Sequence, residues 1–344
     1  MAQPDLDFFR KRNLLLKVEA VEGTDSVPVG GTDAIRLFDG NSSTEYDAVE
    51  RPMDKAFFGN DPFGVANRRA RIEGDFEVYP PPTPGAVATS DADCGRILLC
   101  AGMAVTKDAV NNLTIYNPIS SALQSYTGYW THTGVLTKVL GSRADISGLA
   151  IQIGERFKGR ASIMGDYTEV VAAANPTVTL PTKVPVIASA RNTRCWLSTL
   201  VRGATASTDA APLSDLLVWS KSLSIDMGNQ LAHKEYSSTS VNGLSDRRGT
   251  FTLRIAKTDI TNDFNPWYVR DNGIVLEARM ATYEVSGTQS SVLTGLYAAL
   301  NIRGQIEQIT PTDIDGDHGW EITGRLIPSD TGGDEFTVEF GDAA

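Results

Sequence analysis

The chain has 344 residues, of which 41% are hydrophobic and 21% are charged, and its formal net charge is −11. This composition predicts a folded chain long enough for two domains and excludes an intrinsically disordered one. The negative charge argues against a protein that grips nucleic acid, because gripping phosphates requires lysine and arginine. It does not exclude a surface past which nucleic acid slides.

The N-terminal residues contain no apolar run of the secretory type, and no stretch approaches the roughly 20 apolar residues of a spanning helix. We therefore expect synthesis in a cytoplasm and no membrane partner. Residues 1–13 are predicted to be an exposed arm, followed by short strands at 14–20 and 34–38. Residues 39–66 are rich in Gly, Asn, Ser, Asp and Pro and predict a long loop, a feature that is commonly functional. Its aromatic residues, Phe57, Phe58 and Phe63, either plug into the core or contact another subunit.

Residues 68–79 alternate with a period of two, which predicts a strand with one buried and one solvated face. Ile72, Phe76 and Val78 form the apolar face. The polar face carries Arg71, Glu73, Asp75 and Glu77. A similar strand is predicted at 247–257, where Phe251, Leu253 and Ile255 lie opposite Thr250, Thr252 and Arg254.

Between and after these strands the pattern indicates mostly β structure. We predict a short helix at 93–104 capped by Asp91 or Asp93, and paired strands at 145–153 and 156–164. Residues 171–215, rich in Ala, Thr, Ser and Pro, are the candidate linker between a first module at 1–170 and a second at 216–344. Inside it, residues 191–201 are expected to form a linking strand or helix turn.

The second module repeats the order of the first. It has a strand at 216–227, a polar loop at 228–246, the strand at 247–257, a short helix within 258–273, a strand at 274–283, late strands at 293–309 and 319–327, and a terminal strand at 335–340. Residues 146–148 match 302–304, and residues 157–161 match 322–326, with a longer hairpin loop at 310–318. Internal duplication and chance similarity between amphipathic strands both remain open.

No catalytic or metal motif stands out. Three cysteines and three histidines are too scattered for zinc, so Cys94, Cys100 and Cys195 are expected to be free thiols. Asp313, Asp315 and Asp317 lack the glycine and glutamate of a calcium loop and predict a solvated hairpin tip. No phosphate-binding loop or nucleophile elbow occurs, so we expect no enzyme and no cofactor.

Tyr126, Tyr129 and Trp130 form an aromatic run with two interpretations. They are strand aromatics that face a core, or they stack on sugars or bases.

Three short segments, residues 14–28, 95–104 and 334–340, resemble major tail tube proteins of long-tailed, non-contractile bacteriophages. Lys17, Glu19, Gly23, Thr24 and Asp25 match the K-x-E-x-x-x-G-T-D opening that is frequent in that family, and residues 98–102 approximate its Leu-Leu-x-Ala-Cys-Gly helix with the cysteine displaced by one. The resemblance implies tandem β-sandwich or split-barrel tube modules, each with a short flanking helix. Such subunits pair edge to edge in rings that stack into a DNA conduit in the virion tail.

By the same resemblance, the partners are further copies of the chain, a tape-measure protein, tail terminator or tip proteins, and DNA in transient, non-specific passage. If the duplication is real, a trimeric ring is favoured over a hexamer in which only one half forms the tube. The candidate lumen-facing residues are Arg71, Glu73, Asp75, Glu77 and Arg254. Phe57, Phe58 and Phe63 are candidate inter-ring contacts. The rival hypothesis is a virion surface or adhesion protein that binds host glycans through its aromatic residues.

Overall fold

The computed structural model describes residues 12–51, 53, 59–81, 87–88, 92–180, 183–200, 216–237, 240–260, 263–284 and 295–343. Within these ranges most residues lie in strands and there are two short helices, which confirms the predicted mostly-β class. We call β1 to β9 with α1 the first half, and β10 to β19 with α2 the second half.

The elements of the first half are, in order, β1 (Arg12–Val18), β2 (Ala34–Ile35), β3 (Phe38–Glu50), β4 (Phe63–Glu77), α1 (Gly95–Cys100), β5 (Met103–Asp108), β6 (Leu113–Pro118), β7 (Tyr126–His132), β8 (Val135–Gln152) and β9 (Lys158–Ala172). Those of the second half are β10 (Thr193–Leu200), β11 (Leu216–Val218), β12 (Ser220–Asp226), β13 (Asn229–Glu235), β14 (Ser240–Arg247), β15 (Thr250–Ala256), α2 (Pro266–Asp271), β16 (Val275–Tyr283), β17 (Gly295–Ile314), β18 (Asp317–Leu326) and β19 (Phe336–Ala343).

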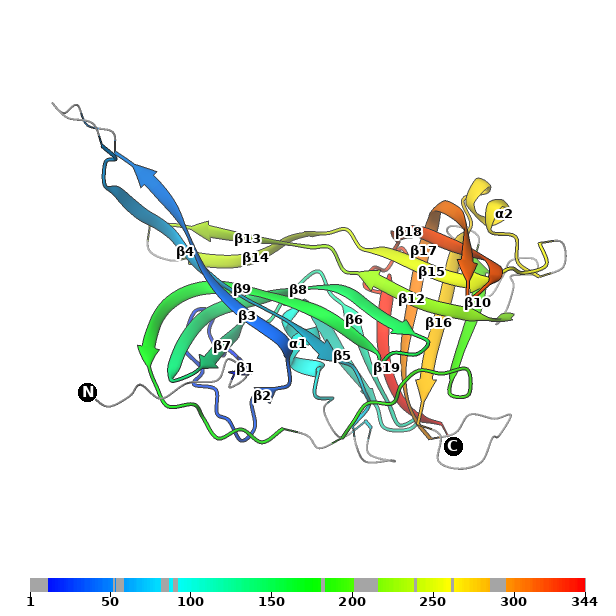
Figure 1. The fold of residues 1–344 in the computed structure, drawn as a ribbon, viewed down its shortest axis with the longest axis horizontal. Coiled ribbons are helices and arrows are strands. Elements are labelled where there is room, and N and C mark those ends of the chain that lie inside the picture. Colours follow the sequence, from blue (N-terminus) through cyan, green and yellow to red (C-terminus); the bar gives the residue numbers. More distant parts are fainter. Residues whose placement is uncertain are drawn as a thin grey trace.

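One antiparallel layer runs through both halves without a break. Its strands pair in the order β3–β4–β9–β8–β12–β15–β18–β17, and we call it the wall sheet. The two halves meet where β12 pairs with the last residues of β8, Leu149 with Ile225 through Gln152 with Ser222. In Figure 1 the two halves appear as lobes joined through these central strands.

A second layer packs behind the wall sheet. One part of it contains β2, β1, β7 and the beginning of β8 from the first half. The other part contains β11, β10, β16, the beginning of β17 and β19 from the second half, and β19 pairs with β6 of the first half, which in turn pairs with β5. The long strands β8 and β17 belong to both layers, with register shifts along their length that let them turn. The core lies between the layers and includes Ile72, Phe76, Ile163, Phe251 and Phe340.

The predicted amphipathic strands are confirmed. In β4, Ala70, Ile72 and Phe76 are buried, and in β15, Phe251, Leu253 and Ile255 are buried. The predicted late strand pairs are β8 with β9 and β17 with β18. However, β17 and β18 continue through the predicted loop at 310–318 to a two-residue turn at Asp315 and Gly316, where both residues have positive φ.

Two predicted loops were wrong. In the predicted loop at 39–66, residues 39–50 and 63–66 belong to the long β3–β4 hairpin, which projects away from the body of the molecule (Figure 1). In the predicted loop at 228–246, residues 229–235 and 240–246 belong to the β13–β14 hairpin, which instead lies against β8 and β9. The outer part of β3–β4 is exposed on both faces, so its side chains show no periodic burial and no strand pattern could be read.

Strand pairing gives a different alignment of the halves from the one predicted. Phe76 lies opposite Gly159 and Phe251 lies opposite Gly324, so residues 74–76 correspond to 249–251. The Arg-Arg pairs at 68–69 and 247–248 are therefore not equivalent. Similarly, Ser147 and Gln305 pair with the corresponding arginines Arg160 and Arg325, which places residue 146 with 304 rather than with 302.

Both predicted helices are confirmed but are shorter than expected. Helix α1 follows Cys94, which makes no side-chain cap bond, while Asp93 accepts a 2.5 Å hydrogen bond from the Tyr79 hydroxyl. Helix α2 begins at Pro266, and the side chain of Asn265 accepts a cap bond from the Tyr268 amide. Residues 193–200 form β10, a strand within the predicted linking segment, whereas the division into modules at 171–215 stays a prediction.

The close packing at Gly324 yields a stability prediction. A Cβ at this position would lie 2.1 Å from the Gln305 carbonyl oxygen and 2.7 Å from the Phe251 ring. We expect Gly324→Ala to lower the free energy of unfolding by about 1–3 kcal/mol, because a backbone oxygen cannot move aside. Gly243→Ala is the matched control, since no atom lies within 4 Å of its Cβ. Urea unfolding of both variants checks this, and equal midpoints would contradict it.

Candidate assembly surfaces

Four of the five candidate lumen residues lie on the solvated face of the wall sheet. Arg71, Glu73 and Asp75 lie on β4, and Arg254 lies on β15. Directly opposite residues of neighbouring strands point to the same side of a sheet, so pairings such as Asp75 with Arg160 and Arg254 with Glu321 place them on one face. The Glu77 side chain lies nearly buried at the end of β4. Its carboxylate forms an ion pair with the Arg156 guanidinium at 2.8 Å.

Cross-strand ion pairs balance the charge of this face. Arg160 lies 3.3 Å from both Glu73 and Asp75, and Arg254 lies 2.5 Å from Glu321. Among the described residues, the pairs on this face join the arginines Arg69, Arg71, Arg160, Arg254 and Arg325 to the carboxylates Glu45, Glu73, Asp75, Glu307 and Glu321. Each such exposed pair contributes little stability. Because of these pairs the face carries both charges, whereas β4 alone suggests an excess of acidic residues.

The wall sheet ends in two edges that lack a strand partner within the described residues. One is the outer edge of β3, which pairs only with β4. The other is the outer edge of β17 beyond Gly304, where β16 stops pairing. The corresponding edge of β8 is occupied by β12. Pro311 lies on the β17 edge, where a residue without an N–H is tolerated.

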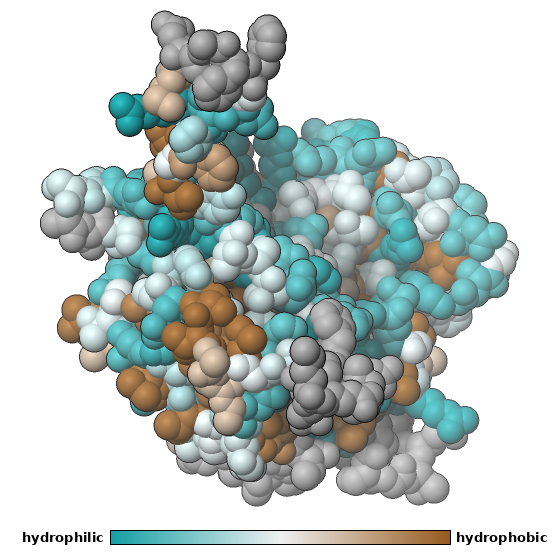
Figure 2. Space-filling model, turned by 60° about the vertical axis from the view of Figure 1, so that its left-hand side comes forward, coloured by the Kyte–Doolittle hydropathy of each residue, from teal (hydrophilic) through white to brown (hydrophobic). Residues whose placement is uncertain are grey.

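The projecting part of β3–β4, which we call the arm (residues 41–50 and 63–68), exposes apolar side chains. Tyr46 and Phe63 are each 51% exposed and stack with ring centroids 6.0 Å apart, and Val49 and Val65 are also exposed. Figure 2 shows hydrophobic side chains grouped on the projecting part. Of the predicted inter-ring contacts, Phe63 therefore lies on an exposed surface. Phe57 and Phe58 lie outside the described residues.

The β13–β14 hairpin is held against the first half by polar contacts. Asp166 of β9 accepts from the Asn242 amide at 2.7 Å and lies 3.1 Å from His233 Nδ1. Arg247 donates to the Ile119 carbonyl at 2.8 Å and to Glu335 at 2.7 Å. The sequence pattern did not predict this hairpin, because most of its side chains are partly buried and show no alternation.

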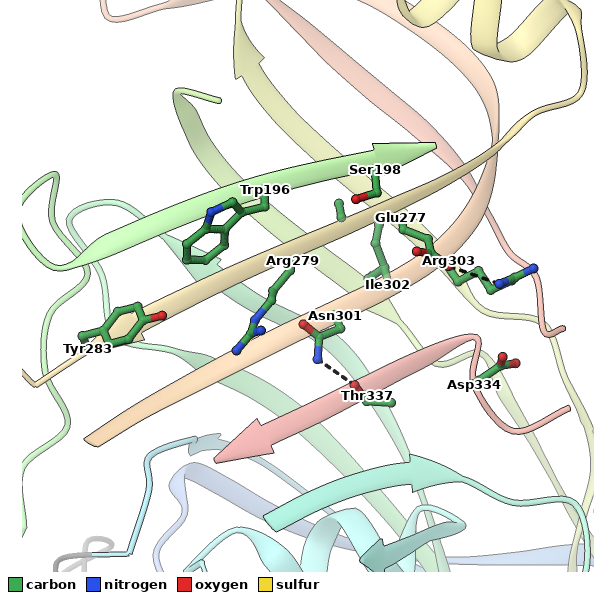
Figure 3. A pocket seen from close by; sticks show the side chains of 11 residues that line it. Trp196, Ser198, Glu277, Arg279, Tyr283, Asn301, Ile302, Arg303, Asp334 and Thr337 are labelled. Atoms are coloured by element: carbon green, nitrogen blue, oxygen red, sulfur yellow. Dashed lines mark hydrogen bonds and ion pairs between the residues drawn. The ribbon is translucent and has the colours of Figure 1, made fainter. Parts of the chain in front are cut away.

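A pocket of about 500 Å³ lies on the face of β10, β16, β17 and β19 (Figure 3). Arg279 lies over the rings of Trp196 and Tyr297, and Arg303 pairs with Glu277 at 3.1 Å. Three polar atoms in these side chains are buried without a hydrogen-bond partner, namely Arg279 Nε, Asn301 Oδ1 and Arg303 Nε. These atoms have almost no accessible surface, so the chain itself encloses them.

The remaining candidate groups serve packing. Cys94, Cys100 and Cys195 are free and buried, and burial raises the pKa of each thiol to about 12, which suppresses the reactive thiolate. The aromatic run is also buried. Asp315 at the hairpin tip binds Lys221 at 2.6 Å, and the described residues contain no cluster of three potential metal ligands. No helix in the described part of the chain has the length and hydrophobicity to cross a membrane.

Residues 10–319 match the model of the phage tail tube protein family. The match covers nearly the whole chain, including the β3–β4 arm and every strand of the wall sheet except most of β18. The chain therefore belongs to this family, and it is a structural protein of the virion tail. No curated protein sequence matches it.

Proposed function

We propose that the chain assembles into three-copy rings that stack to form the tail tube, a conduit for DNA delivery to the host cell. The wall sheet is the observation that carries the proposal. Its eight strands cross both halves of the chain and end in one unpaired edge on each side. Pairing the β17 edge of one copy with the β3 edge of the next would remove both edges, which otherwise promote aggregation.

Barrel geometry favours three copies. With strands about 4.8 Å apart and tilted by about 40°, twenty-four strands give a backbone diameter of about 48 Å. Side chains extending about 5 Å inward leave a bore of about 38 Å, enough for hydrated duplex DNA of roughly 20 Å. Two copies would leave a bore of only about 22 Å.

The rival hexamer requires only one half of each chain to line the bore. The β8–β12 pairing supports a wall to which both halves contribute equally. Six such chains would give a barrel about 95 Å across, far wider than DNA requires. We therefore favour the trimer, with the two halves as duplicated tube modules separated within residues 171–215.

The solvated face of the wall sheet is proposed to line the bore. Arginines bound by neighbouring carboxylates are poor partners for phosphate, so DNA would pass without lasting attachment. Arg71, Glu73, Asp75 and Arg254 then act as members of a charge-balanced wall, and Glu77 lies at its margin. A tape-measure protein and terminator or tip proteins complete the proposed partners, with assembly in the host cytoplasm.

The glycan-binding alternative is not favoured, because Tyr126, Tyr129 and Trp130 are packed inside the protein. An enzymatic role has no support in the described residues either. The thiols of Cys94, Cys100 and Cys195, the candidate nucleophiles, are all buried.

The β17 edge provides a test of ring closure. By the pairing-based alignment, Glu307 corresponds to Leu149, whose backbone pairs with β12 across the junction between the halves. We expect Glu307→Pro to fold but to lose ring and tube formation, because it removes one outward N–H and stiffens the edge. Glu307→Ala, which keeps the N–H, should assemble. Analytical ultracentrifugation with circular dichroism checks this. Normal assembly of a folded Glu307→Pro variant would contradict the proposed edge pairing.

The wall residue Thr323 provides a test of the bore. It lies opposite Thr252 on the solvated face, so a lysine there adds positive charge without breaking an ion pair. We expect tubes of Thr323→Lys to retain duplex DNA at low salt and to release it as salt rises, because bound phosphates displace counterions. Wild-type and Thr323→Gln tubes should retain none. Co-sedimentation at several salt concentrations measures this, and identical retention by all three would exclude Thr323 from the bore.

A further inference from the structure

We propose that a pocket at the start of β12, around Trp219, receives the β3–β4 arm of a copy in the adjacent ring. The inference rests on the proposed stacking of rings and assigns the surface that each ring offers to the next. Identical rings that stack in one direction need two different surfaces, one on each rim, because such head-to-tail contacts repeat without closing. The arm and this pocket form such a pair.

The arm and the pocket lie at opposite ends of the wall strands. β4 runs from the arm to Glu77, which pairs with the first residue of β9. At this same end, which we call the base, Gln152 of β8 pairs with Ser222 near the start of β12. The last residue of β15 pairs there with Gly319 near the start of β18. In Figure 1 the arm projects on one side of the molecule, and β12 begins on the other.

The pocket has a volume of about 590 Å³ and lies between the base of the wall sheet and the second-layer strands β10 and β11. Its lining combines apolar and charged side chains, including Ile153, Arg194, Leu217, Trp219, Lys221 and Ile314. Two of the apolar ones face solvent, since Trp219 is 85% exposed and Leu217 is 53% exposed. An exposed apolar patch with a polar rim is typical of a protein-binding surface.

The arm carries a complementary apolar face. Ala48 pairs with Val65, and Glu50 pairs with Phe63, so these four side chains point to one side of the hairpin. Tyr46 lies on the same side, because its ring stacks on that of Phe63. All five are exposed in the isolated chain. Packing this face against the indole and the neighbouring leucine of the pocket removes both apolar surfaces from water, which favours association.

Charge adds to the match. Glu50 lies at the outer end of the arm face and has no basic partner in the described part of the chain. Arg194 at the pocket donates to the carbonyls of Ala190 at 3.1 Å and Thr193 at 2.9 Å, and no described carboxylate pairs with it. A carboxylate on one surface and a guanidinium on the other can pair across the contact, which favours this orientation of the two copies.

Ring closure leaves the apolar face of the arm free. β12 pairs with β8 only from Ser222 to Ile225, and Ile225 lies opposite Phe251, which corresponds to Phe76. The equivalent part of β3 is therefore its wall end near Phe38, whose partner on β4 is the residue before Phe76. The outer arm is not needed to pair with β17 within the ring, so it is available to the next ring.

Trp219→Ala tests the contact in the full chain. We expect this variant to fold and to form rings, but to need about tenfold more protein than wild type to stack into tubes, because an exposed Trp is a typical anchor of an interface. Val65→Ser on the arm face should show the same loss. Val49→Ser is the matched control, since Val49 pairs with Gly64 on the opposite face of the arm. Sedimentation velocity and negative-stain microscopy measure this.

Cross-linking identifies the contact directly. We expect tubes of Ala48→Cys/Asp317→Cys, treated with a short bismaleimide at pH 7, to yield a covalent ladder that extends beyond trimers, because each link joins two rings. Asp317 is exposed and lines the pocket. The native cysteines do not interfere, because all three are buried with raised thiol pKa values. The control Val110→Cys/Asp317→Cys, with Val110 on the β5–β6 turn, should remain monomeric in denaturing gels.

The outcomes separate the docking from the proposed function. Normal stacking of Trp219→Ala, or tubes whose cysteines at 48 and 317 stay unlinked, would overturn the docking and leave the tube intact. A ladder that ends at trimers would place the contact within one ring and would also overturn it. Wild-type chain that forms no rings at all would instead overturn the proposed function.

Discussion

The pairing of β8 with β12 is the interaction on which the rest of this structure depends. It joins the first and second halves into one sheet, so a single chain presents a wall of eight strands instead of two separate sets of four. The two edges of this sheet expose backbone donors and acceptors, and such unpaired edges favour association with another strand. The need to pair these edges is the physical reason for self-assembly in our account.

The same junction explains the shape of the hairpins. β12 pairs with β8 and then bends at Gly228 to run over the first half as β13. The β3–β4 hairpin instead projects from the body of the molecule (Figure 1), while the inner part of β4 stays paired with β9.

Sequence patterns predicted those parts of the fold in which one face is buried. Alternation in β4 and β15 follows directly from burial of Phe76 and Phe251, whereas helix α1 forms without the aspartate cap that the sequence suggested. The sequence did not predict the arm, because its strands are exposed to solvent on both faces. Such strands lack the alternation of apolar and polar residues that marks a strand. The alignment of the halves was displaced because it relied on Arg-Arg pairs, whereas the Phe–Gly cross-strand packing fixes the register.

For the candidate site, sequence indicated Arg71, Glu73, Asp75 and Arg254 as solvated strand residues, and the structure places them on one face. Their charge balance was hidden, because Arg160 and Glu321 come from strands that are distant in sequence. The pocket around Arg303 could not be read from sequence at all, since β10, β16, β17 and β19 contribute to it from a span of over a hundred residues.

Electron cryomicroscopy of the assembled tube tests the central claim most directly. The account predicts three chains per ring, with β17 of each chain hydrogen-bonded to β3 of the next in a closed wall of about twenty-four strands. Rings of six chains, in which only one half of each chain reaches the bore, would contradict it.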